Sequence, residues 1–165
     1  IKYTIGRRPY GYVGFGDIMV FIFFGILGVA GTYFLHSGSL HPAILLPASS
    51  VGLLSVGVLN LNNLRDREND ALSGKNTLVV RMGVSWAKAY HVVLLFTALV
   101  LAVLYTFLYF HSYYQFIFLL PLPLLIIDIQ QVITNTVPVE LNRELKRLAM
   151  ATLLFSLAFG IGLVL

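Results

Sequence analysis

Residues 43–70 have the sequence AILLPASSVGLLSVGVLNLNNLRDREND, in which a long apolar run passes directly into a polar block. The apolar part has about the 20 residues that a helix needs to cross the hydrocarbon core of a membrane. If the helix continues into the polar block, Asn62, Asp66 and Asp70 fall at positions i, i+4 and i+8 and share one face. The stretch therefore predicts a membrane helix that ends in two carboxylates and two carboxamides, a donor set suited to a hard divalent cation such as Mg²⁺.

The composition indicates that this helix is one of several in a membrane protein. Hydrophobic residues make up 58% of the chain and charged residues only 11%, which is far from the balance of a soluble domain. None of the apolar segments alternates strictly between apolar and polar residues, which argues against a β-barrel. We therefore predict an all-α, polytopic transmembrane bundle with five spans, at residues 18–34, 43–61, 91–110, 116–133 and 148–165.

The positions of the 11 Lys and Arg residues predict the orientation. All of them precede the first span, lie between the second and third, or lie between the fourth and fifth. By the positive-inside rule, the N-terminus and the loops 62–88 and 134–147 are cytoplasmic, and the C-terminus faces outward. Because the basic residues are spread over three segments, the net charge of +4 gives no reason to expect a nucleic-acid partner.

The remaining titratable residues carry weaker signals. Cysteine is absent, and the four histidines lack metal-ligand spacing, so we expect packing or interfacial roles for them, including His91 near the inner end of the third span. Asp128 is the one carboxylate within a predicted span, and such residues are usually functional or paired. Since Gln130 and Gln131 follow it, we favour a satisfied interfacial carboxylate. Pro121 and Pro123 in the same span predict a kink or local unwinding.

Two familiar loop motifs do not fit the polar block. An EF-hand beginning at Asp66 would need Gly at the position of Ala71 and Glu at that of Thr77. A P-loop around Gly74-Lys75 would need Gly at the position of Asn69 and a hydroxyl residue at that of Asn76. A solvated loop with incidental charges remains the plain alternative to a metal site.

The chain opens with IKYTIGRRPYGYVGFGD, residues 1–17. Arg7 and Arg8 are suited to bidentate phosphate binding, and a positive-inside anchor is the alternative. There is no initiator Met and no signal-peptide pattern, so we expect the chain to be part of a larger protein.

Two of these segments together resemble known motifs. Residues 62–70 (NNLRDREND), followed by GKNTL at 74–78 and VRMG at 80–83, resemble the second aspartate-rich motif of the UbiA superfamily of intramembrane prenyltransferases. The pattern YTxGxRPxGYxGxGD at 3–17 resembles the segment that precedes the fifth helix of that fold. Within the superfamily, the similarity points to the enzymes that prenylate 1,4-dihydroxy-2-naphthoate in menaquinone biosynthesis.

The resemblance implies that residues 1–165 form about the latter five helices of a single nine-helix prenyltransferase domain. The superfamily carries a first aspartate-rich motif, of Asn-Asp-x-x-Asp type, on an earlier helix, and these residues contain no such sequence. The two motifs face each other across a cavity that opens to the cytoplasm. Activity would therefore need the preceding helices, and the isolated 165 residues would be inactive.

Site roles follow from the same resemblance. It implies that Asp66 and Asp70 are the catalytic residues and bind Mg²⁺. The diphosphate of a polyprenyl diphosphate would be bound by five further residues, and Tyr3 would contact the substrate. Those five residues are Asn62, Asn63, Arg65, Lys75 and Arg7.

The implied reaction transfers the polyprenyl group to 1,4-dihydroxy-2-naphthoate with loss of its carboxylate, giving demethylmenaquinone. It would take place in the bacterial cytoplasmic (inner) membrane, with the prenyl tail between helices and within reach of lipid and the site loops on the cytoplasmic side. The alternatives are a superfamily enzyme with another aromatic acceptor, a catalytically incomplete fragment, and part of a transporter. A transporter would be supported by paired inverted repeats, and the sequence shows none.

Overall fold

The computed structural model describes residues 14–165, and all regular structure within them is helical. In chain order the elements are α1 (Gly16–Val20), η2 (Phe21–Gly31), α2 (Thr32–Ser37), η3 (Pro42–Ile44), α3 (Leu45–Leu72), α4 (Leu78–Met82), α5 (Val84–Leu108), η4 (Tyr113–Leu119), α6 (Leu122–Thr134), η5 (Pro138–Glu140) and α7 (Leu141–Val164). Several join end to end, which leaves five helices long and apolar enough to cross a membrane. The predicted all-α fold with five spans is confirmed.

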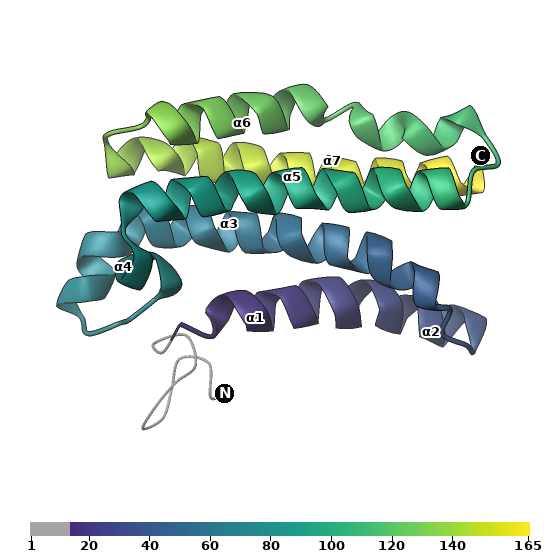
Figure 1. The fold of residues 1–165 in the computed structure, drawn as a ribbon, viewed down its shortest axis with the longest axis horizontal. Coiled ribbons are helices and arrows are strands. Elements are labelled where there is room, and N and C mark those ends of the chain that lie inside the picture. Colours follow the sequence, from purple (N-terminus) through teal and green to yellow (C-terminus); the bar gives the residue numbers. More distant parts are fainter. Residues whose placement is uncertain (1–13) are drawn as a thin grey trace.

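The five long helices run side by side, and the connections alternate between the two ends of the bundle (Figure 1). α4 and the loop before α7 lie at the end where α1 begins. The connections at residues 38–41 and 109–112 lie at the opposite end. We call the end where α1 begins the inner end, because it carries every Lys and Arg of the described residues. The structure thus gathers the basic loops on one side, as the charge pattern requires.

α3 is the central helix, since it packs against η2, α5 and α7. Close packing at this centre depends on small residues. A Cβ placed on Gly25 of η2 would lie 2.6 Å from the Ala48 carbonyl oxygen and 2.7 Å from Gly52 Cα, so the two backbones touch. Such contacts are typical of membrane helices, whose association depends on close packing rather than on a hydrophobic driving force.

Two helices begin well before the predicted apolar segments. The third span begins at Val84 rather than His91, and the fifth at Pro138 rather than Leu148. In α7, Arg147 pairs with Glu144 within the polar first turns. In α5, Lys88 Nζ donates to the carbonyls of Ile133 and Asn135 at the end of α6. The fourth span is interrupted as predicted, since η4 ends at Leu119 and α6 begins after Pro121.

The interfacial placement predicted for Asp128 is wrong. Its side chain is fully buried, and its Oδ2 lies 2.8 Å from Nε2 of the equally buried His91. Asp128 is on α6 and His91 on α5, so the pair joins two spans. Adjacent glutamines suggested an interface, but the face of α6 that carries Asp128 turns inward. The packing role expected for His91 is confirmed.

Candidate active site

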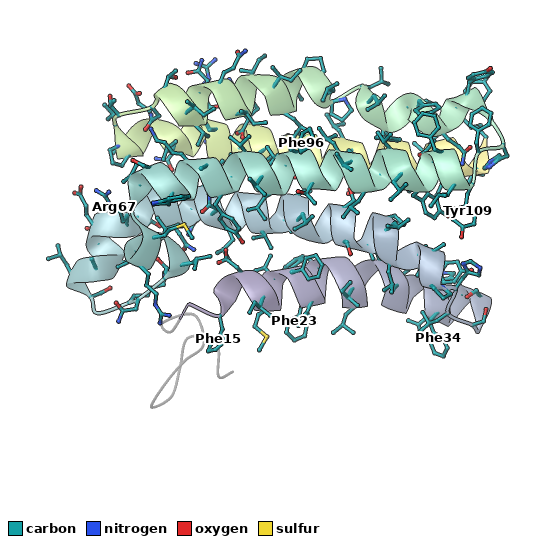
Figure 2. All side chains as sticks on the ribbon, viewed as in Figure 1. Phe15, Phe23, Phe34, Arg67, Phe96 and Tyr109 are labelled. Carbon is teal, nitrogen blue, oxygen red and sulfur yellow. The ribbon has the colours of Figure 1, made fainter. Side chains whose placement is uncertain are left out.

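Asn62, Asp66 and Asp70 all lie in α3, which continues to Leu72, so the predicted helical extension of the apolar run is confirmed. Figure 2 labels Arg67 of this segment at the inner end of the bundle, far from Tyr109 at the other end. The segment is less apolar than the rest of α3 but packs against α4 and η5. These contacts keep the polar turns ordered.

Arg65 organises the first half of the site. Its Nε and Nη2 donate to Asp66 Oδ1 and Oδ2 at 2.7 and 2.6 Å, a two-point pairing of guanidinium and carboxylate. Nη2 also donates to Asn62 Oδ1 at 2.8 Å, and Nη1 donates to Asn142 Oδ1 of α7 at 2.9 Å. One guanidinium therefore joins the two α3 residues to α7.

Lys75 pairs with the second aspartate. Its Nζ donates to Asp70 Oδ1 and Oδ2 at 3.0 and 3.2 Å. This pairing depends on the end of α3, where Gly74 adopts a φ of +72° that L side chains rarely take. The turn directs the chain back, so that the Lys75 amide donates to the Asp70 carbonyl at 2.8 Å. Thr77 then caps α4 by accepting a hydrogen bond from the Val80 amide.

The structure separates the two asparagines that the sequence put together. Asn62 lies on the face of Asp66 and bonds to Arg65. Asn63 is one position further round the helix and is buried, with 5% of its surface exposed. Since adjacent residues of a helix point in different directions, Asn62 and Asn63 face different surroundings, and the diphosphate-binding roles predicted for them stay predictions.

The donor set fits a magnesium ion. Asp66, Asp70 and Asn62 offer carboxylate and amide oxygens on one helix face, and Mg²⁺ usually takes one or two carboxylates together with water and substrate phosphates. Residues 14–165 hold no cluster of three His, Cys, Asp or Glu side chains that would form a metal cage alone. The Mg²⁺ assignment stays a prediction.

A mostly apolar groove of about 450 Å³ begins at the site. It lies between α1, η2, α3 and α7, and Asn62 is the lining residue that also bonds to Arg65. The sequence reasoning did not identify the groove, although its α3 and α7 residues recur at helical spacing, a pattern that core packing also produces. The lining residues are Val20, Phe24, Ser55, Val58, Leu59, Asn62, Leu145, Ala149 and Thr152.

Tyr3, Arg7 and Arg8 lie outside the described residues, so their predicted roles stay predictions. The first described residue, Gly14, lies against the loop that follows α3. A Cβ placed on Gly14 would be 3.3 Å from the Asn76 carbonyl oxygen and 3.4 Å from Arg81 Cζ. The segment that leads into α1 therefore meets the loop that carries Lys75.

Comparison with known proteins bears directly on this arrangement. The model of the UbiA prenyltransferase family matches residues 1–151. The chain belongs to this family. It is 46% identical to 1,4-dihydroxy-2-naphthoate octaprenyltransferase of Escherichia coli over 165 residues, which cover 100% of the chain and 54% of that protein.

Two further relatives show the range of the similarity. The enzyme of the same name from Haemophilus influenzae is 44% identical over 164 residues, covering 99% of the chain and 53% of the relative. UbiA prenyltransferase domain-containing protein 1 of Gallus gallus is 34% identical over 91 residues, covering 55% of the chain and 27% of the relative. The chain thus spans about half the length of the bacterial relatives. No solved structure matches it.

Proposed function

We propose that this chain is the part of a UbiA-family enzyme that holds the diphosphate of a polyprenyl diphosphate during transfer to 1,4-dihydroxy-2-naphthoate. The transfer would release the acceptor's carboxylate and give demethylmenaquinone. The observation that carries the proposal is the position of Asn62, where the charged end of α3 meets the apolar groove. A donor with a charged head and a long apolar tail has the same two-part character. The names of the bacterial relatives support the choice of acceptor.

The cations of the site have a direct part in the proposed chemistry. Arg65 and Lys75 each make a pairing that is partly exposed, with 23% and 27% of their side chains accessible. A diphosphate entering beside Asp66 and Asp70 can therefore accept hydrogen bonds from these groups without a large desolvation cost. Charge on the departing diphosphate would be stabilised there, while the allylic carbon becomes cationic and is attacked by the electron-rich ring of the acceptor.

Asp66 and Asp70 would hold Mg²⁺, with Asn62 as a further oxygen donor. Bound Mg²⁺ supplies positive charge that neutralises the diphosphate as it leaves. The chain's own part is to hold two carboxylates one turn apart on a rigid helix. It also keeps them from repelling one another when the metal is absent, through Arg65 and Lys75.

The orientation belongs to the same proposal. The site would face the cytoplasm, in the inner membrane of a bacterium, with the outer loops on the other side. In a full-length protein whose other cysteines are removed, Gly74→Cys and Gly38→Cys can be labelled from either side of sealed vesicles, since these 165 residues contribute no cysteine. Gly74→Cys should react from the cytoplasmic side and Gly38→Cys from the opposite side. Labelling of both from the same side would overturn the orientation.

The test of function uses the full-length protein in a host that lacks its own enzyme. Membranes are supplied with polyprenyl diphosphate and dihydroxynaphthoate, with and without Mg²⁺, and demethylmenaquinone is measured. Product that depends on Mg²⁺ supports the proposal, whereas full turnover in the presence of a chelator contradicts the metal assignment. Replacing dihydroxynaphthoate by other hydroxylated aromatic acids tests the acceptor. The 165 residues should be inactive alone and regain activity with the helices that carry the first aspartate-rich motif.

A further inference from the structure

Three fully buried polar side chains form a cluster between α3, α5 and α6 that the proposed chemistry does not use. They are Asn60, His91 and Asp128, and we call them the polar junction. Burying polar side chains inside a membrane bundle costs free energy unless they pair, and such residues usually have a function. The junction lies on the opposite side of α3 from the groove.

The junction joins three helices in series. Asn60 Nδ2 of α3 donates to the Ala87 carbonyl of α5 at 3.0 Å. Ala87 is one helical turn before His91, whose Nε2 lies 2.8 Å from Asp128 Oδ2 of α6. The ring of His91 also faces α3, because a Cβ placed on Gly57 would lie 3.9 Å from its Cε1. α5 is thus fixed to α6 on one side and holds α3 on the other.

The helical geometry of α3 relates this contact to the site. At 3.6 residues per turn, Asn62 lies about 200° around the helix from Asn60, and Asp66 about 240°. The α3 residues that line the groove, including Val58 and Leu59, fall in the same sector as Asn62. Asn60 therefore binds α5 from the side of α3 that is opposite to Asn62 and the groove.

We propose that Asn60 is a positioning residue that fixes the rotation of α3 and so directs Asn62 and Asp66 toward the groove. It is held by the Ala87 carbonyl of α5, the helix that the His91–Asp128 pair joins to α6. The inference rests on the proposed function for its effect on turnover. Its structural part, the rotation of α3, is independent of that function. A rotation would move the carboxylates away from a diphosphate held in line with the groove.

The chain offers a matched control at Ser50. Its Oγ donates to the Ala98 carbonyl at 2.7 Å, so it is also a buried side chain of α3 bonded to the backbone of α5. Ser50 lies ten residues before Asn60, about 15 Å further from the inner end at 1.5 Å per residue. Ser50→Ala and Asn60→Leu each remove one such bond. Only Asn60→Leu removes a hydrogen bond that lies next to the site.

The first readout is kinetic, in the full-length protein. Asn60→Leu should lower kcat/KM for the polyprenyl diphosphate by about a hundredfold, the effect of displacing reacting groups by about 1 Å. Ser50→Ala should lower the thermal midpoint to a similar extent and change kcat/KM less than about threefold. Asn60→Gln keeps an amide donor and should recover part of the loss. If Asn60→Leu does not insert, the smaller Asn60→Ala replaces it.

The second readout follows rotation without using activity. In a full-length protein with other cysteines removed, Val58→Cys in the groove should react with a membrane-permeant maleimide, and Leu61→Cys, fully buried, should not. Adding Asn60→Leu should change the rate at which Val58→Cys or Leu61→Cys reacts, whereas adding Ser50→Ala should leave both rates unchanged. An unchanged pattern with Asn60→Leu, or equal loss of kcat/KM in the two variants, overturns the inference. A wild-type protein without prenyl transfer would instead refute the proposed function, and the labelling would still test the rotation.

Discussion

The pairs at the inner end of α3 and the pair between α5 and α6 use the same chemistry in different surroundings. In each, a basic nitrogen meets a carboxylate oxygen at a similar distance: 2.6 Å for Arg65 and Asp66, 3.0 Å for Lys75 and Asp70, and 2.8 Å for His91 and Asp128. The side chains of Asp66 and its partner Arg65 are 33% and 23% exposed, and those of Lys75 and Asp70 are 27% and 10% exposed. The side chains of His91 and Asp128 are 0% exposed. Burial, rather than bond length, separates a pair that can exchange partners from one that holds helices together.

The physical reason is the cost of an unpaired charge. Near the membrane surface, water and counterions can replace a lost partner, so Arg65 can turn from Asp66 to a phosphate. Within the bundle nothing replaces the partner, and breaking a buried pair leaves a polar group unsatisfied. We therefore expect substitutions at the inner end of α3 to lower activity, and substitutions of the His91–Asp128 pair to lower stability.

The largest effect is expected at the aspartates of α3. Asp66→Asn and Asp70→Asn should each lower prenyl transfer by the full-length enzyme about a thousandfold, since metal-held charge stabilisation is worth several kcal/mol. Insertion and thermal midpoint should change little. Glu68→Gln is the matched control, because it removes a carboxylate from the same segment whose side chain is 74% exposed. Near-normal turnover in either aspartate variant would exclude that residue as a metal ligand.

The buried pair should respond unequally to loss of its two members. His91→Leu leaves a carboxylate without a partner and should cost about 3–5 kcal/mol of stability. Asp128→Leu leaves a histidine that can be neutral, at about 1–3 kcal/mol. Thermal or denaturant unfolding in detergent, with folded yield as a second measure, checks the order. Equal and small losses would show that the pair does not hold α5 to α6.

A smaller change is expected at Lys75. Lys75→Met should raise KM for the polyprenyl diphosphate about tenfold and leave kcat within a few-fold, because one charged hydrogen bond to the bound head group is lost. Arg67→Met is the control, since Arg67 pairs with exposed Glu68 instead of a site residue. Steady-state kinetics over a range of donor concentrations separates KM from kcat. A KM equal to that of the wild type would remove Lys75 from the diphosphate site.

The smallest effect should come from the Arg67–Glu68 pair itself. Exposed ion pairs add little to stability, so removing it with Glu68→Gln should not shift the thermal midpoint measurably, at low or high salt. A clear, salt-dependent loss would show that exposure is a poor guide to which pairs matter here. Burial would then not explain why the His91–Asp128 pair differs from the pairs at the inner end of α3.

The site residues show how far sequence reasoning reaches. The positions of Asp66 and Asp70 on one helix face follow from spacing alone, and the break at Pro121 follows from the chemistry of proline. The ion-pair partners of the two aspartates cannot be derived from the spacing of the sequence. Arg65 and Asp66 are neighbours, and neighbours on a helix normally diverge, yet the long Arg65 side chain turns back to reach the carboxylate. Lys75 reaches Asp70 only because the chain reverses at Gly74.

By itself, the sequence determined the all-helical membrane fold, the five spans, the gathering of basic residues at one end and the face that carries the two aspartates. These properties depend on local composition and on helical periodicity, which residues close in the chain define. Only the tertiary structure decided that His91 meets Asp128, that Asn63 faces inward while Asn62 faces the site, and that an apolar groove begins at Asn62. Each of these depends on how far a helix is rotated against its neighbours. That rotation is set by close packing and buried hydrogen bonds between residues distant in the chain, which no local pattern records.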